Sequence, residues 1–126
     1  LLFNKKNKLY RKKTLICTLL LSGTKEIKKL NKKFRNKNKS TDVLSFPFYE
    51  KKKLTNKIRR ENEIYLGDII INLSKVKYKN DLNKFKQELN KLWIHGLVHL
   101  FGHRHKSEKD FFEMSKVEKK FLEYLN

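Results

Sequence analysis

The sequence predicts an α+β fold, in which helices pack on a small mixed β-sheet. Short apolar runs of strand length alternate with longer segments whose apolar residues recur at helical spacing. The most apolar of the helical segments, near residue 95, is expected to be central and buried. The chain has 126 residues, enough for one modest core, so we expect a single domain over residues 1–126.

The first apolar run, residues 15–21, is predicted to be a buried strand. A basic segment, residues 5–13, precedes it, so that the two together superficially resemble a signal peptide. The apolar run is short and no A-x-A cleavage site follows it, which favours a strand. Cys17 lies in this run and is expected to be a small buried hydrophobe. It is the single cysteine, so no internal disulfide is possible, and we expect a cytoplasmic protein.

A helix is predicted next, from Thr24 to about Phe34. Thr24 is a candidate cap, and the inner face would carry Ile27, Leu30 and Phe34. Residues 36–40 are polar and are expected to form a loop.

Two further strands are predicted at residues 43–48 and 64–71. Pro47 is the only proline and suits an edge strand. The charged segment between them, residues 49–63, shows no apolar periodicity, so we expect a long solvated hairpin connection. Its cations are candidates for RNA contact: Lys51, Lys52, Lys53, Arg59 and Arg60.

The last third of the chain is predicted to be helical. A short helix is expected at residues 73–78, and Asp81 would cap a long one through Phe101. That long helix is amphipathic at Leu82, Phe85 and Leu89 and apolar nearly all round after Lys91. Ser107 and Asp110 form a capping box for a final helix. Its inner stripe would be Phe111, Met114, Val117, Phe121 and Leu125.

The long helix carries the pattern H-x-x-x-H-x-x-G-x-x-H, formed by His95, His99, Gly102 and His105. Residues four apart lie on one face of a helix, so the first two imidazoles can reach one ion. A glycine tolerates the backbone conformation that ends a helix and lets the chain bring His105 back. Three imidazoles with an open fourth position are typical of a catalytic zinc site, and we expect one Zn²⁺ per chain. The alternative is that these histidines are only satisfied core residues.

The same spacing occurs in metzincin proteases, whose second position is the glutamate that acts as general base. Here that position is Gly96. The zinc pattern is therefore kept while a proteolytic function is weakened. A metzincin-like protein hydrolase stays an alternative, as does a non-catalytic assembly factor that uses zinc only for structure.

Three blocks of sequence resemble the YbeY family, the bacterial metal-dependent endoribonucleases of ribosomal RNA maturation. Residues 95–105, H-G-L-V-H-L-F-G-H-R-H, are similar to the family's H-G-x-L-H-L-x-G-Y-D-H signature. Residues 30–47, L-N-K-K-F-R-N-K-N-K-S-T-D-V-L-S-F-P, resemble its segment ending T-D-V-L-S-F-P. Residues 66–71, L-G-D-I-I-I, resemble a family strand. His103 and Arg104 depart from the family's tyrosine and aspartate, which makes His103 a possible competing ligand.

The resemblance implies an endoribonuclease of single-strand type that hydrolyses RNA phosphodiesters. The resemblance further implies a role in 16S ribosomal RNA 3′-end maturation and ribosome quality control, with ribosomal RNA and the small ribosomal subunit as partners. The resemblance also implies that Arg35 is catalytic, and its planar guanidinium matches phosphate oxygens better than lysine does. The alternative for Arg35 is an ordinary surface arginine. Asp42 and Ser45 are weaker candidates.

The charge of the chain is compatible with an RNA partner. Lysine and arginine total 32 against 13 acidic residues, a formal net charge of +19. Only five of the 32 are arginine, so an AT-rich genome is an equally good explanation for the lysines. No segment is long enough to span a bilayer, and we expect no membrane partner and no small-molecule cofactor.

Overall fold

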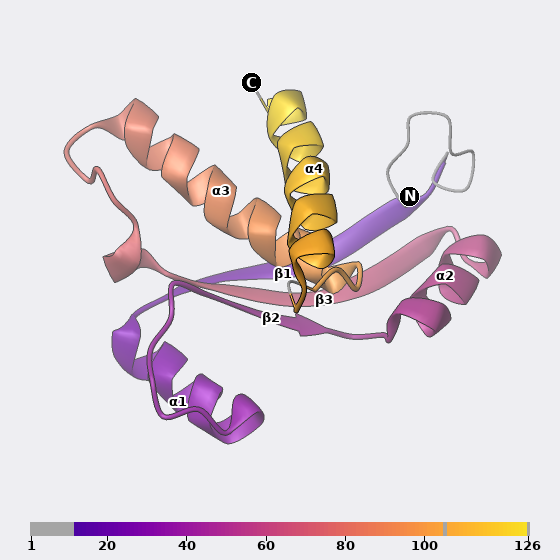
Figure 1. Ribbon diagram of the computed structural model, residues 1–126, viewed down its shortest axis with the longest axis horizontal. Coiled ribbons are helices and arrows are strands. Elements are labelled where there is room, and N and C mark those ends of the chain that lie inside the picture. Colours follow the sequence, from indigo (N-terminus) through magenta and orange to yellow (C-terminus); the bar gives the residue numbers. More distant parts are fainter. Residues whose placement is uncertain (1–11, 105, 126) are drawn as a thin grey trace.

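The computed structural model describes residues 12–104 and 106–125 and confirms the α+β fold (Figure 1). Strands and helices alternate through the first half of the chain, and helices form the second half. In chain order the elements are β1 (Thr14–Ser22), α1 (Thr24–Arg35), β2 (Val43–Pro47), α2 (Lys51–Arg60), β3 (Glu63–Asn72), the 3₁₀ turn η2 (Leu73–Lys75), α3 (Leu82–Leu100) and α4 (Glu108–Leu125).

The three strands form one mixed sheet in the order β1-β3-β2. Strand β1 runs parallel to β3, and β2 runs antiparallel to it. The central strand β3 is buried over most of its length, with Glu63 and Asp68 exposed, as expected of a strand with a neighbour on each side. Pro47 lies in β2, which pairs with β3 alone among the described strands, so the expected edge position is confirmed.

Helices cover the two faces of the sheet unequally. Helix α1 lies on one side of the sheet, and α3 and α4 lie on the other (Figure 1). On the α1 side, Ile27 packs with Leu44 and Ile70 in a small core. On the α3 side, a larger core contains Ile69 and Ile71 of β3 together with the end of α3 and the apolar residues of α2.

Three expectations for the first strand and helix were wrong in detail. Strand β1 forms as predicted but contains no buried residue, because it lies at an edge of the sheet, and Cys17 is half-buried. Thr24 does not cap α1; the N-cap is Gly23, and the Thr24 hydroxyl hydrogen-bonds to Ser74 Oγ at 2.8 Å. Phe34 is 59% exposed rather than part of the inner face.

The expected solvated connection between β2 and β3 is instead the ten-residue helix α2. Leu54 and Ile58 lie one helical turn apart and are both buried in the larger core. Two apolar residues at that spacing give a charged helix enough buried contact to form against the core. The hairpin itself is confirmed, since β2 and β3 are antiparallel neighbours.

Helix α3 follows the prediction closely. Asp81 Oδ1 accepts a hydrogen bond from the Lys84 amide at 3.2 Å, as expected of the cap. The second half of α3 is buried at Ile94, Gly96, Val98 and Leu100. Leu82, at its start, is 66% exposed and does not belong to the inner face.

Helix α4 packs against α3 through Met114 and Val117, which form a cluster with Ile94 and Val98. Ser107 Oγ accepts from the Asp110 amide at 3.1 Å, which confirms half of the capping box. The predicted inner stripe is too long: Phe111 is 62% exposed and Leu125 is 45% exposed. Only the middle of the stripe faces α3.

Candidate functional site

His95 and His99 lie one turn apart on α3, and both are half-buried. Their Nε2 atoms face each other at 3.2 Å. In a tetrahedral zinc site with Zn–N bonds of about 2.0–2.1 Å, two nitrogen ligands lie about 3.3 Å apart. The two imidazoles are therefore already separated by the distance that a shared zinc ion requires.

The opposite ring nitrogens are held by oxygen acceptors. Nδ1 of His95 lies 2.7 Å from Oε1 of Glu118 on α4, and Nδ1 of His99 donates to the backbone oxygen of His103 at 2.8 Å. Such contacts place the proton of a neutral imidazole on Nδ1 and leave the lone pair on Nε2. In that tautomer the two Nε2 lone pairs face the same point, where one cation would contact both. With the proton on either Nε2, the same pair forms a hydrogen bond.

His105, the predicted third ligand, lies outside the described residues. Within residues 12–104 and 106–125, no group of three histidine, cysteine or acidic side chains is placed to hold a metal. Gly102 does end the helix as predicted: α3 stops at Leu100, and Gly102 has a φ of +94°.

The backbone oxygen of His103 accepts the hydrogen bond from His99, and the His103 imidazole takes no part in this contact. Burial first, and the charge of Lys51 second, lower the pKa of His103. Its Nε2 is buried and has no hydrogen-bond partner among the described residues. His103 therefore supports the pair through its main chain, whatever its side chain does.

Gly96 occupies the position between the two histidines that faces the sheet. A Cβ at residue 96 would lie 2.6 Å from Ile69 Cγ2 and 3.0 Å from Ser45 Oγ. A side chain here would therefore force Ile69, Ser45 or the helix to move. Ser45 Oγ donates to the Gly96 carbonyl at 3.0 Å and holds the two elements together. A metzincin-type glutamate at this position would disturb the contact between α3 and the sheet.

Arg35, the predicted catalytic residue, is the last residue of α1. Its Nη2 donates to the backbone oxygen of Ser45, and its guanidinium carbon lies 5.5 Å from the centre of the Phe46 ring. Ser45 is thus bonded on one side to Arg35 and on the other to Gly96, next to His95. The structure places Arg35 two hydrogen bonds from the helix of the histidines.

The other weak candidate, Asp42, has a structural role in the turn before β2. Its backbone oxygen accepts from the Asn72 amide at 2.8 Å, and its carboxylate accepts from the Thr41 hydroxyl at 3.3 Å. Asp42 therefore fixes the start of β2.

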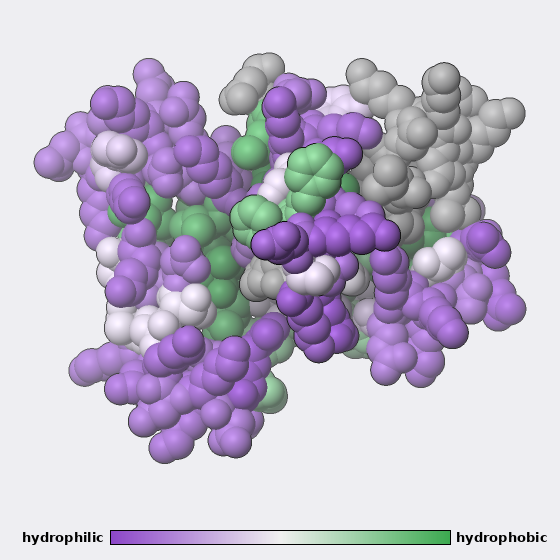
Figure 2. All heavy atoms as spheres, in the orientation of Figure 1, coloured by the Kyte–Doolittle hydropathy of each residue, from purple (hydrophilic) through white to green (hydrophobic). Residues whose placement is uncertain are grey.

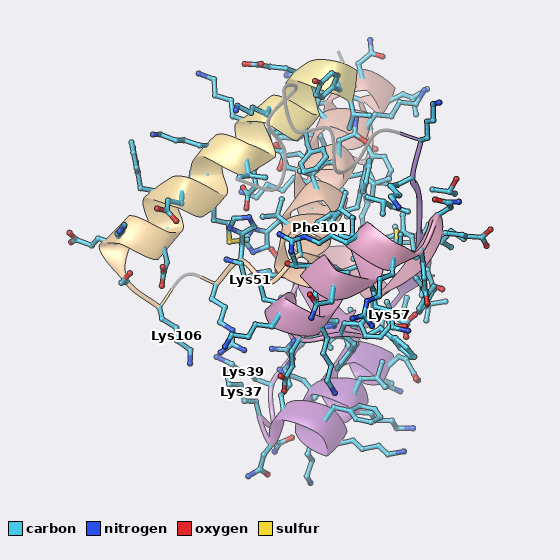
Figure 3. All side chains as sticks on the ribbon, turned by 90° about the vertical axis from the view of Figure 1, so that its right-hand side faces the viewer. Lys37, Lys39, Lys51, Lys57, Phe101 and Lys106 are labelled. Carbon is cyan, nitrogen blue, oxygen red and sulfur yellow. The ribbon has the colours of Figure 1, made fainter. Side chains whose placement is uncertain are left out.

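Several lysines gather on one side of the molecule, which we call the lysine flank. Figure 3 shows Lys37, Lys39, Lys51 and Lys106 on one flank of the molecule, between α1 and α4. The stem of Lys51 lies against Gly102, where an added Cβ would be 3.0 Å from Lys51 Cβ. Hydrophilic side chains cover most of the face in Figure 2. The lysine flank presents positive charge, which suits an anionic ligand.

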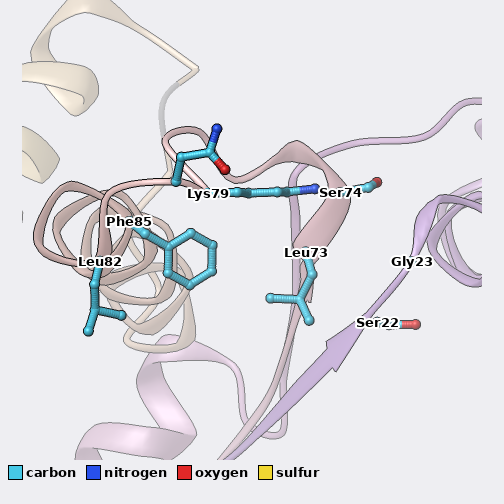
Figure 4. Close-up of a pocket in the computed structure, with 8 residues that line it drawn as sticks. Ser22, Gly23, Leu73, Ser74, Lys79, Leu82 and Phe85 are labelled. Carbon is cyan, nitrogen blue, oxygen red and sulfur yellow. The ribbon is translucent and has the colours of Figure 1, made fainter.

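A pocket of about 730 Å³ lies elsewhere, between the starts of α1 and α3 (Figure 4). Its lining includes Gly23, Leu73, Ser74, Leu82 and Phe85. It contains neither the histidine pair nor Arg35, and its walls hold no group of catalytic residues.

A family model described as Endoribonuclease YbeY matches residues 2–126. The chain belongs to the YbeY family. Proteins named Endoribonuclease YbeY are among its relatives. The chain is similar to those of Pelagibacter ubique (47% identity over 56 residues, 43% of this chain and 37% of that protein) and Thermodesulfovibrio yellowstonii (42% over 72 residues, 52% and 45%). These matches span less than half the length of each relative.

The fold is similar to the solution structure of TM1509 from Thermotoga maritima. The match covers 92% of this chain and 73% of that chain, with 30% sequence identity and a TM-score of 0.55. In the described part of the chain, no helix is both long enough and apolar enough to cross a membrane.

The blocks that resemble the YbeY family meet at one place in the fold. Residues 43–47 form β2, residues 66–71 form most of β3, and Gly96 packs against both. Sequence reasoning missed Glu118, which lies beyond these blocks. Its signal was an acidic residue one turn after Met114, on the face of α4 that packs against α3.

Proposed function

We propose that this protein is a metal-dependent endoribonuclease whose zinc ion is held by His95, His99 and His105. The observation that carries the proposal is the pair of Nε2 atoms facing each other at 3.2 Å, with both Nδ1 atoms held by oxygens. Membership of the YbeY family supports RNA as the substrate class. Zinc at this site would supply either a water of lowered pKa or a Lewis acid for a phosphoryl oxygen.

The chain's own residues then have separate roles. Glu118 and the His103 carbonyl orient the two imidazoles and fix their tautomers. Arg35 would stabilise negative charge that develops on the reacting phosphate, and the Ser45 carbonyl and the Phe46 ring support its guanidinium. A phosphate that reaches Arg35 would compete with the Ser45 carbonyl for its N–H groups.

Residue 96, the position of the general base in metzincins, is a glycine. It packs on Ile69 and Ser45 and has no carboxylate that could accept a proton. Proton removal would then depend on the metal, on solvent or on the substrate itself, so we expect a slow enzyme. The same packing argues against the alternative of a metzincin-like protein hydrolase.

Ribosomal RNA of the small subunit is the substrate we propose, in 16S 3′-end maturation and ribosome quality control in the cytoplasm. Two observations support an RNA partner: the family, and the formal net charge of +19. The lysine flank between α1 and α4 (Figure 3), in which Lys51 lies against Gly102 after the histidine helix, offers positive charge to a phosphate backbone.

The test combines metal analysis with cleavage. Protein purified without a histidine tag should contain about one zinc per chain and should cleave a fragment spanning the 16S 3′ end in single-turnover assays. A chelator should abolish cleavage, and added zinc should restore it. Cleavage that persists without metal would contradict the proposal. Firm RNA binding with full zinc and no cleavage would instead indicate the non-catalytic assembly factor.

A further inference from the structure

The sheet face opposite α3 carries a row of aromatic rings, which we call the aromatic strip: Phe34, Phe46, Phe48 and Tyr65. Phe34 and Phe46 meet edge to face with ring centres 5.5 Å apart, and Phe48 and Tyr65 do so at 5.7 Å. Phe46 lies in β2, and Phe48 follows directly after the strand. The Phe48 amide donates to the Leu66 oxygen at 2.9 Å, which holds this end of the strip against β3.

Cations accompany the strip. Lys33 Nζ lies 5.2 Å from the centre of the Phe34 ring, and the Arg35 guanidinium lies 5.5 Å from that of Phe46. At the other end, Tyr49 packs edge to face on Phe48 at 4.8 Å, and Lys57 Nζ lies 5.7 Å from the Tyr49 ring. Positive charge therefore lies beside both ends of the strip.

Two rings of the strip lie outside the core: Phe34 is 59% exposed and Phe48 is 63% exposed. Phe46 is half-buried and packs against the small core of Ile27, Leu44 and Ile70, and Tyr65 is also half-buried. The exposed rings of Phe34 and Phe48 offer a surface to which a ligand can bind.

The charge and the rings together identify the occupant. A second copy of this chain would bring together two molecules of formal charge +19, which opposes association through a cation-lined face. Single-stranded RNA matches both the rings and the cations of this surface. Its bases stack on aromatic rings, and its phosphates pair with lysine and arginine. The exposed carboxylate of Asp68, which accepts a hydrogen bond from Tyr65 Oη, lies on the β3 side. Phosphates would therefore follow the Lys33 and Arg35 side.

We infer that the aromatic strip is a stacking surface for a single-stranded RNA segment, an inference that rests on the proposed function. The strip lies on the sheet face opposite the candidate metal centre, and the edge strand β2 connects the two. Phe46 follows Ser45, whose hydroxyl bonds to the Gly96 carbonyl beside His95. An RNA strand stacked on the exposed rings of Phe34 and Phe48 would thus run along this edge strand.

The test measures binding without cleavage. Metal-free protein in a chelator is titrated with a short fluorescent single-stranded RNA, and with the same RNA as a duplex. Phe34→Ala and Phe48→Ala should each weaken single-strand affinity by about fivefold to a hundredfold, the loss of one stacked base. The salt dependence of binding should stay the same, because no charge is removed. Phe48→Trp should keep the affinity, and duplex binding should change little.

Phe112→Ala is the matched control. Phe112 is 60% exposed and has Lys116 Nζ 4.4 Å from its ring centre, but it lies on α4. Its replacement should leave single-strand affinity within about twofold of the wild type. Equal affinities for wild type, Phe34→Ala and Phe48→Ala would overturn the inference, as would an equal loss in Phe112→Ala.

Binding in the absence of metal separates this inference from the proposed function. If the protein never cleaves RNA but the strip variants bind single strands more weakly, the nuclease proposal fails and the stacking surface stands. If cleavage is normal and the variants bind normally, only the stacking surface fails. Sedimentation experiments test the other occupant. A wild-type dimer that Phe48→Ala dissociates would show that a second copy of the chain occupies the strip, and this result would also overturn the inference.

Discussion

Ser45 Oγ donates a 3.0 Å hydrogen bond to the carbonyl oxygen of Gly96, across the contact between β2 and α3. Both partners are buried, and the absence of a side chain at residue 96 is what allows the approach. A helical carbonyl that already accepts within its helix has a second lone pair for such a bond. This contact fixes the height of His95 above the sheet, and it connects the histidine helix to the strand that Arg35 touches.

Gly96→Ala should destabilise the fold. The new Cβ would lie 2.6 Å from Ile69 Cγ2, a contact that forces the helix or strand to move. Overpacking typically costs about 1–3 kcal/mol, and the gain in helix propensity offsets about 1 kcal/mol of it. We expect a net loss of up to about 2 kcal/mol in the free energy of unfolding from urea titration. Gly23→Ala, which meets no atom within 4 Å, should cost less; equal effects would contradict the close approach.

His99→Ala should remove both zinc and cleavage, because two ligands at most would remain from the predicted three. His103→Ala should spare most of the zinc, since His103 supports His99 through its backbone oxygen, which alanine retains. Elemental analysis of each purified variant decides the matter. Unchanged zinc affinity in His99→Ala would exclude this residue from the site. If His103→Ala loses more zinc than His105→Ala does, then His103 rather than His105 is the third ligand.

Glu118→Gln should weaken zinc binding by about tenfold, the lower end of the range for an outer partner of a metal-bound histidine. The amide keeps an oxygen near His95 Nδ1 but removes the carboxylate charge that makes the imidazole a better ligand. Competition against a coloured chelator measures the affinity. Glu123→Gln, on the exposed part of the same helix, is the control and should bind zinc like the wild type.

Arg35→Lys should lower the single-turnover cleavage rate by a factor of about ten to a thousand, because the charge stays but the planar fork is lost. RNA affinity and its salt dependence should change little. Arg59→Ala should do the reverse if α2 contacts RNA, with weaker binding, a shallower salt dependence and near-normal cleavage at saturation. Wild-type cleavage by Arg35→Lys with full zinc would make Arg35 an ordinary surface cation.

The Cys17 thiol should react slowly with iodoacetamide. Burial first, and the charge of Asp68 second, raise the pKa of Cys17, so less thiolate is present at any given pH than in an exposed cysteine. The midpoint of its pH–rate profile should lie above that of the urea-unfolded chain. Asp68→Asn should move the midpoint down part of the way. A folded protein that reacts as fast as the unfolded chain would contradict this assignment.

The sequence predicted those elements whose signals are local. The Asp81 cap and the apolar second half of α3 are properties of neighbouring residues, and both are confirmed. Helix α2 was missed because Leu54 and Ile58 are its only strongly apolar residues. These two stabilise the helix only by packing into a core that other segments build. Strand β1 was expected to be buried because its residues are apolar, but burial depends on its place at the edge of the sheet.

The candidate site divides in the same way. The spacing of His95 and His99 predicts that their rings share one side of a helix, and the structure agrees. Glu118 and the Ser45–Gly96 bond join residues 23 and 51 positions apart, and no local pattern reports contacts of that range. Gly96 was interpreted chemically, as a missing base; its physical reason is the packing of α3 on β3.

The parallel pairing of β1 with β3 has a consequence for how the protein folds. Thr14 pairs with Glu63 and Ser22 with Asn72, so this pairing closes a loop of about fifty residues. Such non-local pairing slows folding relative to helical proteins of similar size. Ile69 and Ser45, on which α3 packs, pair with each other in the β2–β3 hairpin of this sheet. The local hairpin alone therefore supplies the surface that positions the histidine pair, whereas completing the sheet with β1 requires the slower non-local pairing.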